Sequence, residues 1–156
     1  MLQIALPELP RHARRHDADE RIASAINAVR AILAADLVPA HKRELLSVCI
    51  WKLTLAEPVN KYATRFVSVA AVACASRDRV HEHVFERSRL VRALIDGRLP
   101  LDELPASAVA CVVTRDEHAR LARAAVEKPG IEGWDRYRAA SIAVVDCARR
   151  CWQLEP

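Results

Sequence analysis

The stretch AVACVVTRDEHARL, residues 108–121, changes from one secondary-structure pattern to another without a linker. Residues 108–114 are a compact run rich in β-branched side chains, the kind that favours a buried strand. Thr114 and Glu117 then have the spacing of a capping box, which marks the beginning of a helix. A strand that runs directly into a helix requires a sheet with a helix packed nearby. This junction therefore predicts a fold that contains both helices and strands.

Helical spacing dominates the first half of the chain. Asp17 and Glu20 have the spacing of another capping box. Four apolar residues follow at helical intervals: Ile22, Ile26, Val29 and Leu33. A second helix is expected to begin after Pro39 and to end before Pro58. Because the linker is short, residues 17–57 predict an antiparallel helical hairpin.

The second half alternates between strand and helix patterns. Residues 66–76 are apolar with small side chains, which suits a helix or a buried strand, and we favour a helix. Residues 79–85 alternate enough for a short strand, and residues 86–95 read as a helix that Gly97 is placed to cap. A proline-bounded loop follows, and residues 134–146 predict a short helix and a last strand. The fold class expected is α+β, predominantly helical, with a small antiparallel sheet.

A length of 156 residues suits a single domain with a real core. Only seven residues are aromatic, so Ala, Val, Leu and Ile must fill the interior, which favours close helix packing. We see neither an apolar run of membrane-spanning length nor a signal-peptide layout, and we therefore expect a cytoplasmic protein that does not contact a membrane. The five cysteines are irregularly spaced and do not form a disulfide framework.

The charge balance gives mild support for a nucleic-acid partner. The net charge is +4, and arginine supplies 20 of the 24 basic residues. Arginine presents a forked donor that suits phosphate. An arginine-rich, alanine-rich and lysine-poor composition is equally what a biased genome base composition produces.

His81, Glu82 and His83 stand side by side in the strand predicted over residues 79–85. Residues two apart share a face of a strand, so the two histidines should point one way and Glu82 the other, unless the strand ends there. His118 lies in the first turns of the later helix. If the strands 79–85 and 108–114 pair antiparallel, that helix can fold back and assemble Glu82, His83 and His118. The alternative is a set of polar residues at a solvated strand end.

The segments HEHV and ACVVTRDEHARL together resemble the HNH or His-Me finger nucleases, the ββα-metal superfamily, over residues 79–125. The resemblance implies that His83 acts as general base on water. It also implies that Glu82 and His118 hold one divalent ion, Mg²⁺, Mn²⁺ or Zn²⁺. The activity implied is endonuclease cleavage of DNA or RNA, or nucleic-acid binding by a relative on the same scaffold.

The chain departs from that family's pattern at several positions. The proline common after the histidine strand is replaced around Phe85 and Glu86, and no asparagine occurs between the two predicted site histidines. Residues 86–97 would form a helix inserted between the strands. The remaining segment, residues 134–156, would add a C-terminal helix, a strand and a tail to the same domain.

Five basic or aromatic residues are candidates for contact with nucleic acid: Lys61, Tyr62, Arg65, Arg87 and Arg115. The segment NKYATRFVS combines cationic, stacking and hydroxyl groups, which suits phosphates and a base. The alternative is an exposed i, i+4 pair of Lys61 and Arg65, with Tyr62 covering the core edge. Arg87 equally fits the polar side of a short amphipathic helix.

A second class of function competes with the nuclease hypothesis. The chain is also compatible with a non-enzymatic helical module for protein interaction or regulation, bound to a protein partner or to a second copy of itself. In that case His81, Glu82 and His83 only cap a strand, and the arginines keep the surface soluble.

Overall fold

Two groups of segments, interleaved along the chain, make up the computed structural model, which describes residues 5–156. The first unit comprises the described residues up to Ala13 together with Lys61–Glu82 and Ala110–Pro156. The second unit comprises Arg14–Asn60 and His83–Val109. The structure is α+β and predominantly helical, as the sequence predicts. Residues 79–125, expected to form one ββα core, are divided between the two units.

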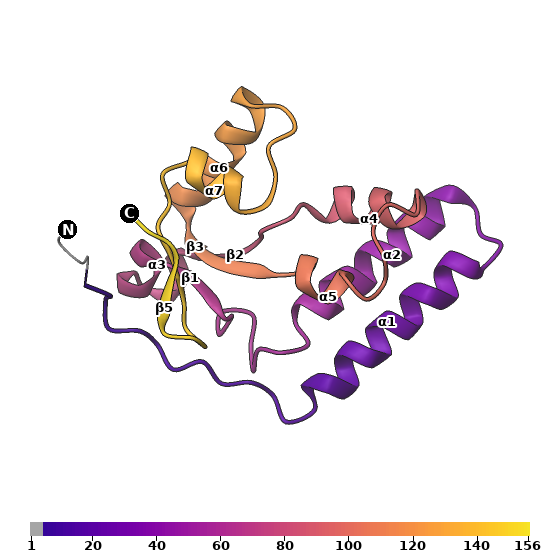
Figure 1. Ribbon diagram of the computed structural model, residues 1–156, viewed down its shortest axis with the longest axis horizontal. Helices are drawn as coiled ribbons and strands as arrows, with labels where there is room; N and C mark the ends of the chain where they lie inside the picture. The colour runs from indigo at the N-terminus through magenta and orange to yellow at the C-terminus, as the bar shows by residue number, and fades with distance from the viewer. Residues whose placement is uncertain (1–4) are drawn as a thin grey trace. The chain divides into compact units, whose positions relative to one another are not determined.

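The second unit is built on a helical hairpin, in which α1 (Ala18–Ala34) and α2 (Pro39–Thr54) lie side by side (Figure 1). This confirms the predicted hairpin. The capping box predicted at its beginning is wrong, because the Asp17 side chain makes no cap bond to the backbone. Its carboxylate instead accepts hydrogen bonds from Arg15 at 2.9 Å and Arg21 at 2.7 Å.

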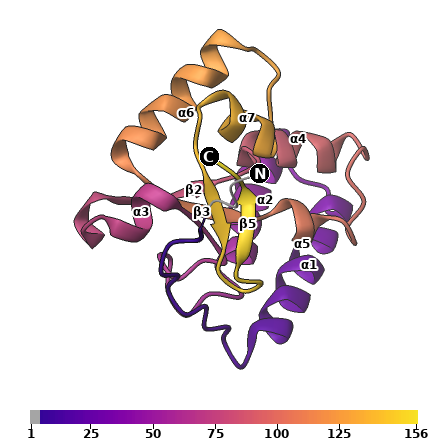
Figure 2. The ribbon, with the colours of Figure 1, turned by 60° about the vertical axis from the view of Figure 1, so that its left-hand side comes forward.

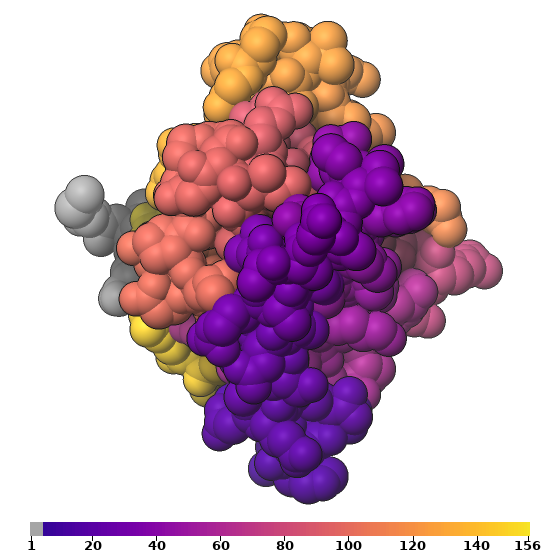
Figure 3. Space-filling view, turned by 90° about the vertical axis from the view of Figure 1, so that its right-hand side faces the viewer, coloured from indigo at the N-terminus to yellow at the C-terminus, as the bar shows by residue number. Residues whose placement is uncertain are grey.

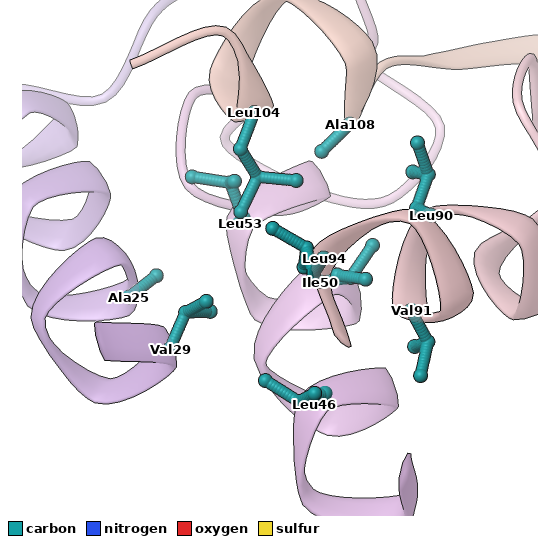
Figure 4. Close-up of a cluster of buried hydrophobic side chains, with 10 residues drawn as sticks. All are labelled: Ala25, Val29, Leu46, Ile50, Leu53, Leu90, Val91, Leu94, Leu104 and Ala108. Atoms are coloured by element: carbon teal, nitrogen blue, oxygen red, sulfur yellow. The ribbon is translucent and has the colours of Figure 1, made fainter. Parts of the chain in front are cut away.

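The segment after residue 82 supplies the rest of this unit with α4 (Arg87–Ile95) and α5 (Leu104–Ser107). The surface of the segment that carries α4 and α5 lies against the hairpin in Figure 3. The buried side chains of this unit converge in Figure 4. They are Ala25, Val29, Leu46, Ile50, Leu53, Leu90, Val91, Leu94, Leu104 and Ala108. Gly97 ends α4 at φ +68°, a conformation that glycine adopts without strain, so the predicted cap is confirmed. The proline-bounded loop expected here instead contains α5, whose first residue, Leu104, is fully buried.

The first unit contains the sheet, in which the described residues form five strands in the order β2-β3-β1-β4-β5. The strands are β1 (Phe66–Ser68), β2 (Arg79–His83, whose last residue belongs to the second unit), β3 (Ala110–Thr114), β4 (Val144–Asp146) and β5 (Cys151–Leu154). β1 is parallel to β3 and antiparallel to β4, and β4 and β5 form an antiparallel pair. The side chains of Leu9, Val67, Ala71, Val112, Val145 and Cys147 form a core cluster.

The helix favoured for residues 66–76 is wrong at its beginning. Phe66–Ser68 is a fully buried strand with a neighbouring strand on each side. The chain then turns into α3 (Val69–Ala73), and a 3-10 turn follows at Ser76–Asp78. The Ser68 hydroxyl caps α3 by accepting from the Ala71 amide at 3.1 Å. Pairing on both sides satisfies the strand's backbone groups, which local side-chain pattern does not reveal.

The predicted ββα segments form as two strands and a capped helix. β2 and β3 are neighbours in the sheet. Beyond the C-terminal end of β2, the Val84 amide donates to the Val109 carbonyl, just before β3, so the pair runs antiparallel. α6 (Arg115–Glu127) follows β3 directly, and both hydrogen bonds of the Thr114–Glu117 capping box are present. α7 (Gly133–Ala139) lies beside α6 (Figure 2).

All five cysteines carry free thiols. Across residues 5–156, we find no helix with both the length and the apolar character that crossing a membrane requires.

Candidate functional site

The Glu82 carboxylate joins two side chains that come from distant parts of the first unit. Its Oε2 lies 2.8 Å from Nδ1 of His118, and its Oε1 accepts a hydrogen bond of 2.7 Å from the Arg136 guanidinium. The exposed fractions of the three side chains are 13% for Glu82, 6% for Arg136 and 51% for His118. The ion pair of Glu82 and Arg136 is therefore nearly buried, whereas the His118 imidazole that contacts Glu82 is accessible to solvent.

Backbone geometry brings Glu82 and His118 together although they are 36 positions apart. Glu82 lies in β2, and His118 lies in the first turn of α6, which begins where the neighbouring strand β3 ends. The capping box determines where α6 begins. The predicted approach of Glu82 and His118 is thus present in the structure.

Glu117, the residue before His118, ties α6 to the sheet. It is buried, and its Oε2 accepts from the Thr114 amide at 2.8 Å and from the Ser68 hydroxyl at 2.5 Å. One bond closes the cap of α6, and the other reaches the end of β1. The first turn of α6, which carries His118, is therefore anchored on the sheet by buried hydrogen bonds.

Arg136 is the member of the cluster that sequence reasoning missed. It lies in α7, next to Tyr137, which is fully buried, and two residues after Trp134, whose ring meets Phe66 edge-on at 4.9 Å. An arginine between aromatic residues was the available signal. No local pattern links it to Glu82, which is 54 positions away.

Cys111 and Tyr137 are buried titratable groups of this unit that burial keeps neutral. Burial raises the pKa of the Cys111 thiol well above its usual range, and the negative charges of Glu117 and Glu82 raise it further. Burial likewise raises the pKa of the Tyr137 hydroxyl well above its usual value. Because a thiolate is the reactive form of cysteine, Cys111 is unsuited to act as a nucleophile.

His83, the predicted general base, belongs to the second unit. Its ring lies 5.4 Å from that of Trp51, and its Nδ1 lies 3.5 Å from the Thr54 hydroxyl oxygen. The Arg87 guanidinium lies 5.4 Å from the centre of the Trp51 ring. His83 and Arg87 therefore share contact with one tryptophan. No signal in the sequence pointed to Trp51.

Glu82 and His118 together offer a divalent ion two ligands, which is too few for a structural zinc and leaves positions open for water and substrate. Oε2 of Glu82 and Nδ1 of His118 are 2.8 Å apart, a hydrogen-bond distance, and two ligand atoms of one ion lie roughly 3.0–3.4 Å apart, so an ion bound by both atoms would replace this hydrogen bond. Within residues 5–156, no group of three or more His, Cys, Asp or Glu side chains is arranged to hold an ion. Mg²⁺ commonly takes one or two protein ligands and completes its sphere with water and phosphate oxygens, whereas structural zinc needs four ligands.

The residues predicted to bind nucleic acid fall into different environments. Lys61 and Arg115 are exposed; Nζ of Lys61 lies 4.8 Å from the centre of the Tyr62 ring, and Arg115 donates to the Arg77 carbonyl at 3.3 Å. Tyr62 packs against the core of the first unit, as its alternative interpretation held. Exposed cations suited to phosphate are thus present in this unit.

Arg65, in contrast, is engaged in a structural ion pair. Its guanidinium donates to both carboxylate oxygens of Asp146, at 2.5 to 3.0 Å. Asp146 is buried, which by itself raises its pKa, but the bonds from Arg65 and from the Arg149 and Ala148 amides lower the pKa below its ordinary value. Contact of Arg65 with a phosphate would require exchange of this partner.

Substitution of Asp146 with asparagine is expected to lower the free energy of unfolding at pH 7 by about 1–2 kcal/mol. Because the folded pKa lies below the ordinary 3.8, the carboxylate stabilises the protein above that pH. Its contribution disappears as the pH falls through the folded value. Urea unfolding at several pH values should therefore show wild type and variant converging below pH 3.8. A constant difference down to pH 2 would contradict this account.

Comparison of the chain with protein-family models, curated proteins and solved structures finds no match.

Proposed function

We propose that this protein is a metal-dependent nuclease that hydrolyses phosphodiester bonds of DNA or RNA. The observation that carries the proposal is the 2.8 Å approach of Glu82 and His118. These are the two residues that the resemblance to the ββα-metal nucleases marks as metal ligands. The order of the elements also supports the proposal. Along the chain, β2 is followed by the inserted helices α4 and α5, and then by β3 and α6.

Each residue has a distinct part in this chemistry. Glu82 provides an anionic oxygen and His118 a ring nitrogen to one divalent ion, Mg²⁺ or Mn²⁺. When bound, the ion supplies stabilisation of the negative charge that develops on the phosphate. The assignment of His83 as the base stays a prediction from the sequence, and it relies on an imidazole that accepts a proton near neutral pH.

Binding of the substrate in this proposal relies on exposed cations. Lys61 and Arg115 are exposed in the first unit, and the chain carries a net charge of +4. Contacts to phosphate oxygens are independent of base sequence and weaken as salt concentration rises. We therefore propose low sequence specificity, and we place the protein in the cytoplasm, where its five free thiols are chemically stable.

Cleavage of plasmid DNA and of structured RNA with Mg²⁺ or Mn²⁺ tests the proposal. His118→Ala is the sharpest variant, because the side chain is half exposed and its loss disturbs packing little. We expect this variant to cut at least about 100-fold more slowly than wild type. His83→Ala tests the base separately and is also expected to lose activity.

The matched control is His41→Ala, an exposed histidine of α2, which should cut like the wild type. Cutting that persists in excess chelator, or in His118→Ala at wild-type rate, would refute the metal site. Absence of cutting by a folded wild type would favour the non-enzymatic interaction module instead. One observation supports that second candidate: α2 leaves Leu45 and Val48, three residues apart, exposed to solvent.

A further inference from the structure

We infer that Arg136 is a positioning residue that keeps Oε2 of the Glu82 carboxylate turned toward His118, so that Glu82 would meet the ion in the orientation that the reaction requires. The inference rests on the proposed function, because it concerns how Glu82 serves the metal site. Arg136 contacts Oε1 of Glu82 at 2.7 Å, while the other oxygen, Oε2, lies 2.8 Å from His118. The guanidinium thus occupies one oxygen and leaves the second on the His118 side.

The burial of Arg136 argues that it positions Glu82 and does not contact the substrate directly. Only 6% of the Arg136 side chain is exposed, compared with 51% for His118. A guanidinium that solvent hardly reaches is poorly placed to bind a phosphate of a large polymer. Its effect on the reaction must therefore pass through Glu82.

The helix that carries Arg136 is firmly held in the first unit. Tyr137 is fully buried, and the Trp134 ring packs edge-on against both Phe66 and Tyr137, at 4.9 and 5.2 Å. Arg120 of α6 donates to the Ala140 carbonyl, just after α7, at 2.8 Å. A cation on a rigid element fixes its anionic partner more precisely than one on a mobile loop.

Occupation of Oε1 has a consequence for how the ion is held. With Oε1 engaged by Arg136, Oε2 is the oxygen that Glu82 would offer first to an ion. The positive charge of Arg136 also opposes the nearby cation. Removal of Arg136 should therefore leave metal affinity unchanged or increased while it impairs the reaction, because Glu82 is free to turn.

Three variants test this inference: Arg136→Gln, Arg136→Lys and the control Arg138→Gln, an exposed arginine of the same helix. Calorimetric titration with Mn²⁺ measures affinity, and cleavage of plasmid DNA gives kcat. For Arg136→Gln we expect an unchanged or lower Kd for Mn²⁺ and a kcat reduced about 10- to 100-fold. Arg136→Lys, which keeps the charge and loses the fork, should fall between Arg136→Gln and wild type. Arg138→Gln should match wild type in both measurements.

Weaker Mn²⁺ binding with unchanged kcat in Arg136→Gln would overturn the inference, as would equal effects of Arg138→Gln. Circular dichroism at the assay temperature establishes whether each variant is folded. If Arg136→Gln is unfolded, Arg136→Lys, which retains the ion pair, provides the test instead.

Nitrogen NMR of the His118 imidazole without metal separates this inference from the proposed function. Arg136→Gln is expected to shift those resonances, since Glu82 contacts Nδ1, and Arg138→Gln is not. Unshifted resonances in Arg136→Gln would overturn the positioning role. Shifted resonances in a protein that neither binds Mn²⁺ nor cuts would support the positioning of Glu82 and refute the nuclease proposal.

Discussion

Replacement of Glu82 with alanine is expected to lower the free energy of unfolding by about 3–5 kcal/mol. The variant leaves the Arg136 guanidinium buried without the carboxylate that it contacts at 2.7 Å. Desolvation of that charge is then no longer offset by the ion pair. Denaturant unfolding followed by circular dichroism measures the loss.

Two further variants identify the cause. Glu127→Ala removes an exposed carboxylate from α6 in the same unit and should change stability by no more than about 0.5 kcal/mol. The double variant Glu82→Ala with Arg136→Ala should lose less than the sum of the single losses, because both single variants remove the same ion pair. Additive losses, or a loss below about 1 kcal/mol for Glu82→Ala, would contradict the assignment of a buried ion pair.

Replacement of Glu117 with alanine is expected to lower the free energy of unfolding by about 2–4 kcal/mol. Its carboxylate is buried and accepts from the Thr114 amide and from the Ser68 hydroxyl. Both donors would lose their acceptor in the interior, where an unmade hydrogen bond is costly. Because α6 carries His118, the same variant should also reduce the proposed nuclease activity.

Asp116→Ala provides the control for Glu117→Ala, since Asp116 is the preceding residue of the same helix turn. Its side chain is 83% exposed and pairs only at the surface with Arg120, so its loss should cost about 0.5 kcal/mol or less. Glu117→Gln, which keeps an acceptor oxygen, should recover part of the stability. Equal losses for Asp116→Ala and Glu117→Ala would show that burial of Glu117 is not what stabilises α6.

Local sequence signals predicted the elements whose determinants lie within a few residues. Thr114 and Glu117 form the expected capping box, because both partners belong to one helix turn. Asp17 and Glu20 have the same spacing and do not form one, since Arg15 and Arg21 bind the Asp17 carboxylate. Even a local signal therefore depends on which neighbours compete for the same side chain.

The candidate site shows the same difference between local and long-range determinants. Glu82 and His118 were predicted to approach because both follow from the positions of two strands and a helix. Arg136 was missed, since its contact with Glu82 joins residues 54 positions apart. Arg65 was expected to face nucleic acid and instead binds Asp146, 81 positions along the chain.

The chain's own pattern was sufficient to determine an α+β fold, the helical hairpin and the strand-to-helix junction that carries His118. Only the tertiary structure decided that Phe66–Ser68 is an inner strand and which cations bind which buried carboxylates. Helix caps and periodicity depend on interactions within one or two turns, which a sequence displays directly. Strand partners and buried ion pairs depend on long-range packing, where many arginines are equivalent in sequence and burial selects one of them.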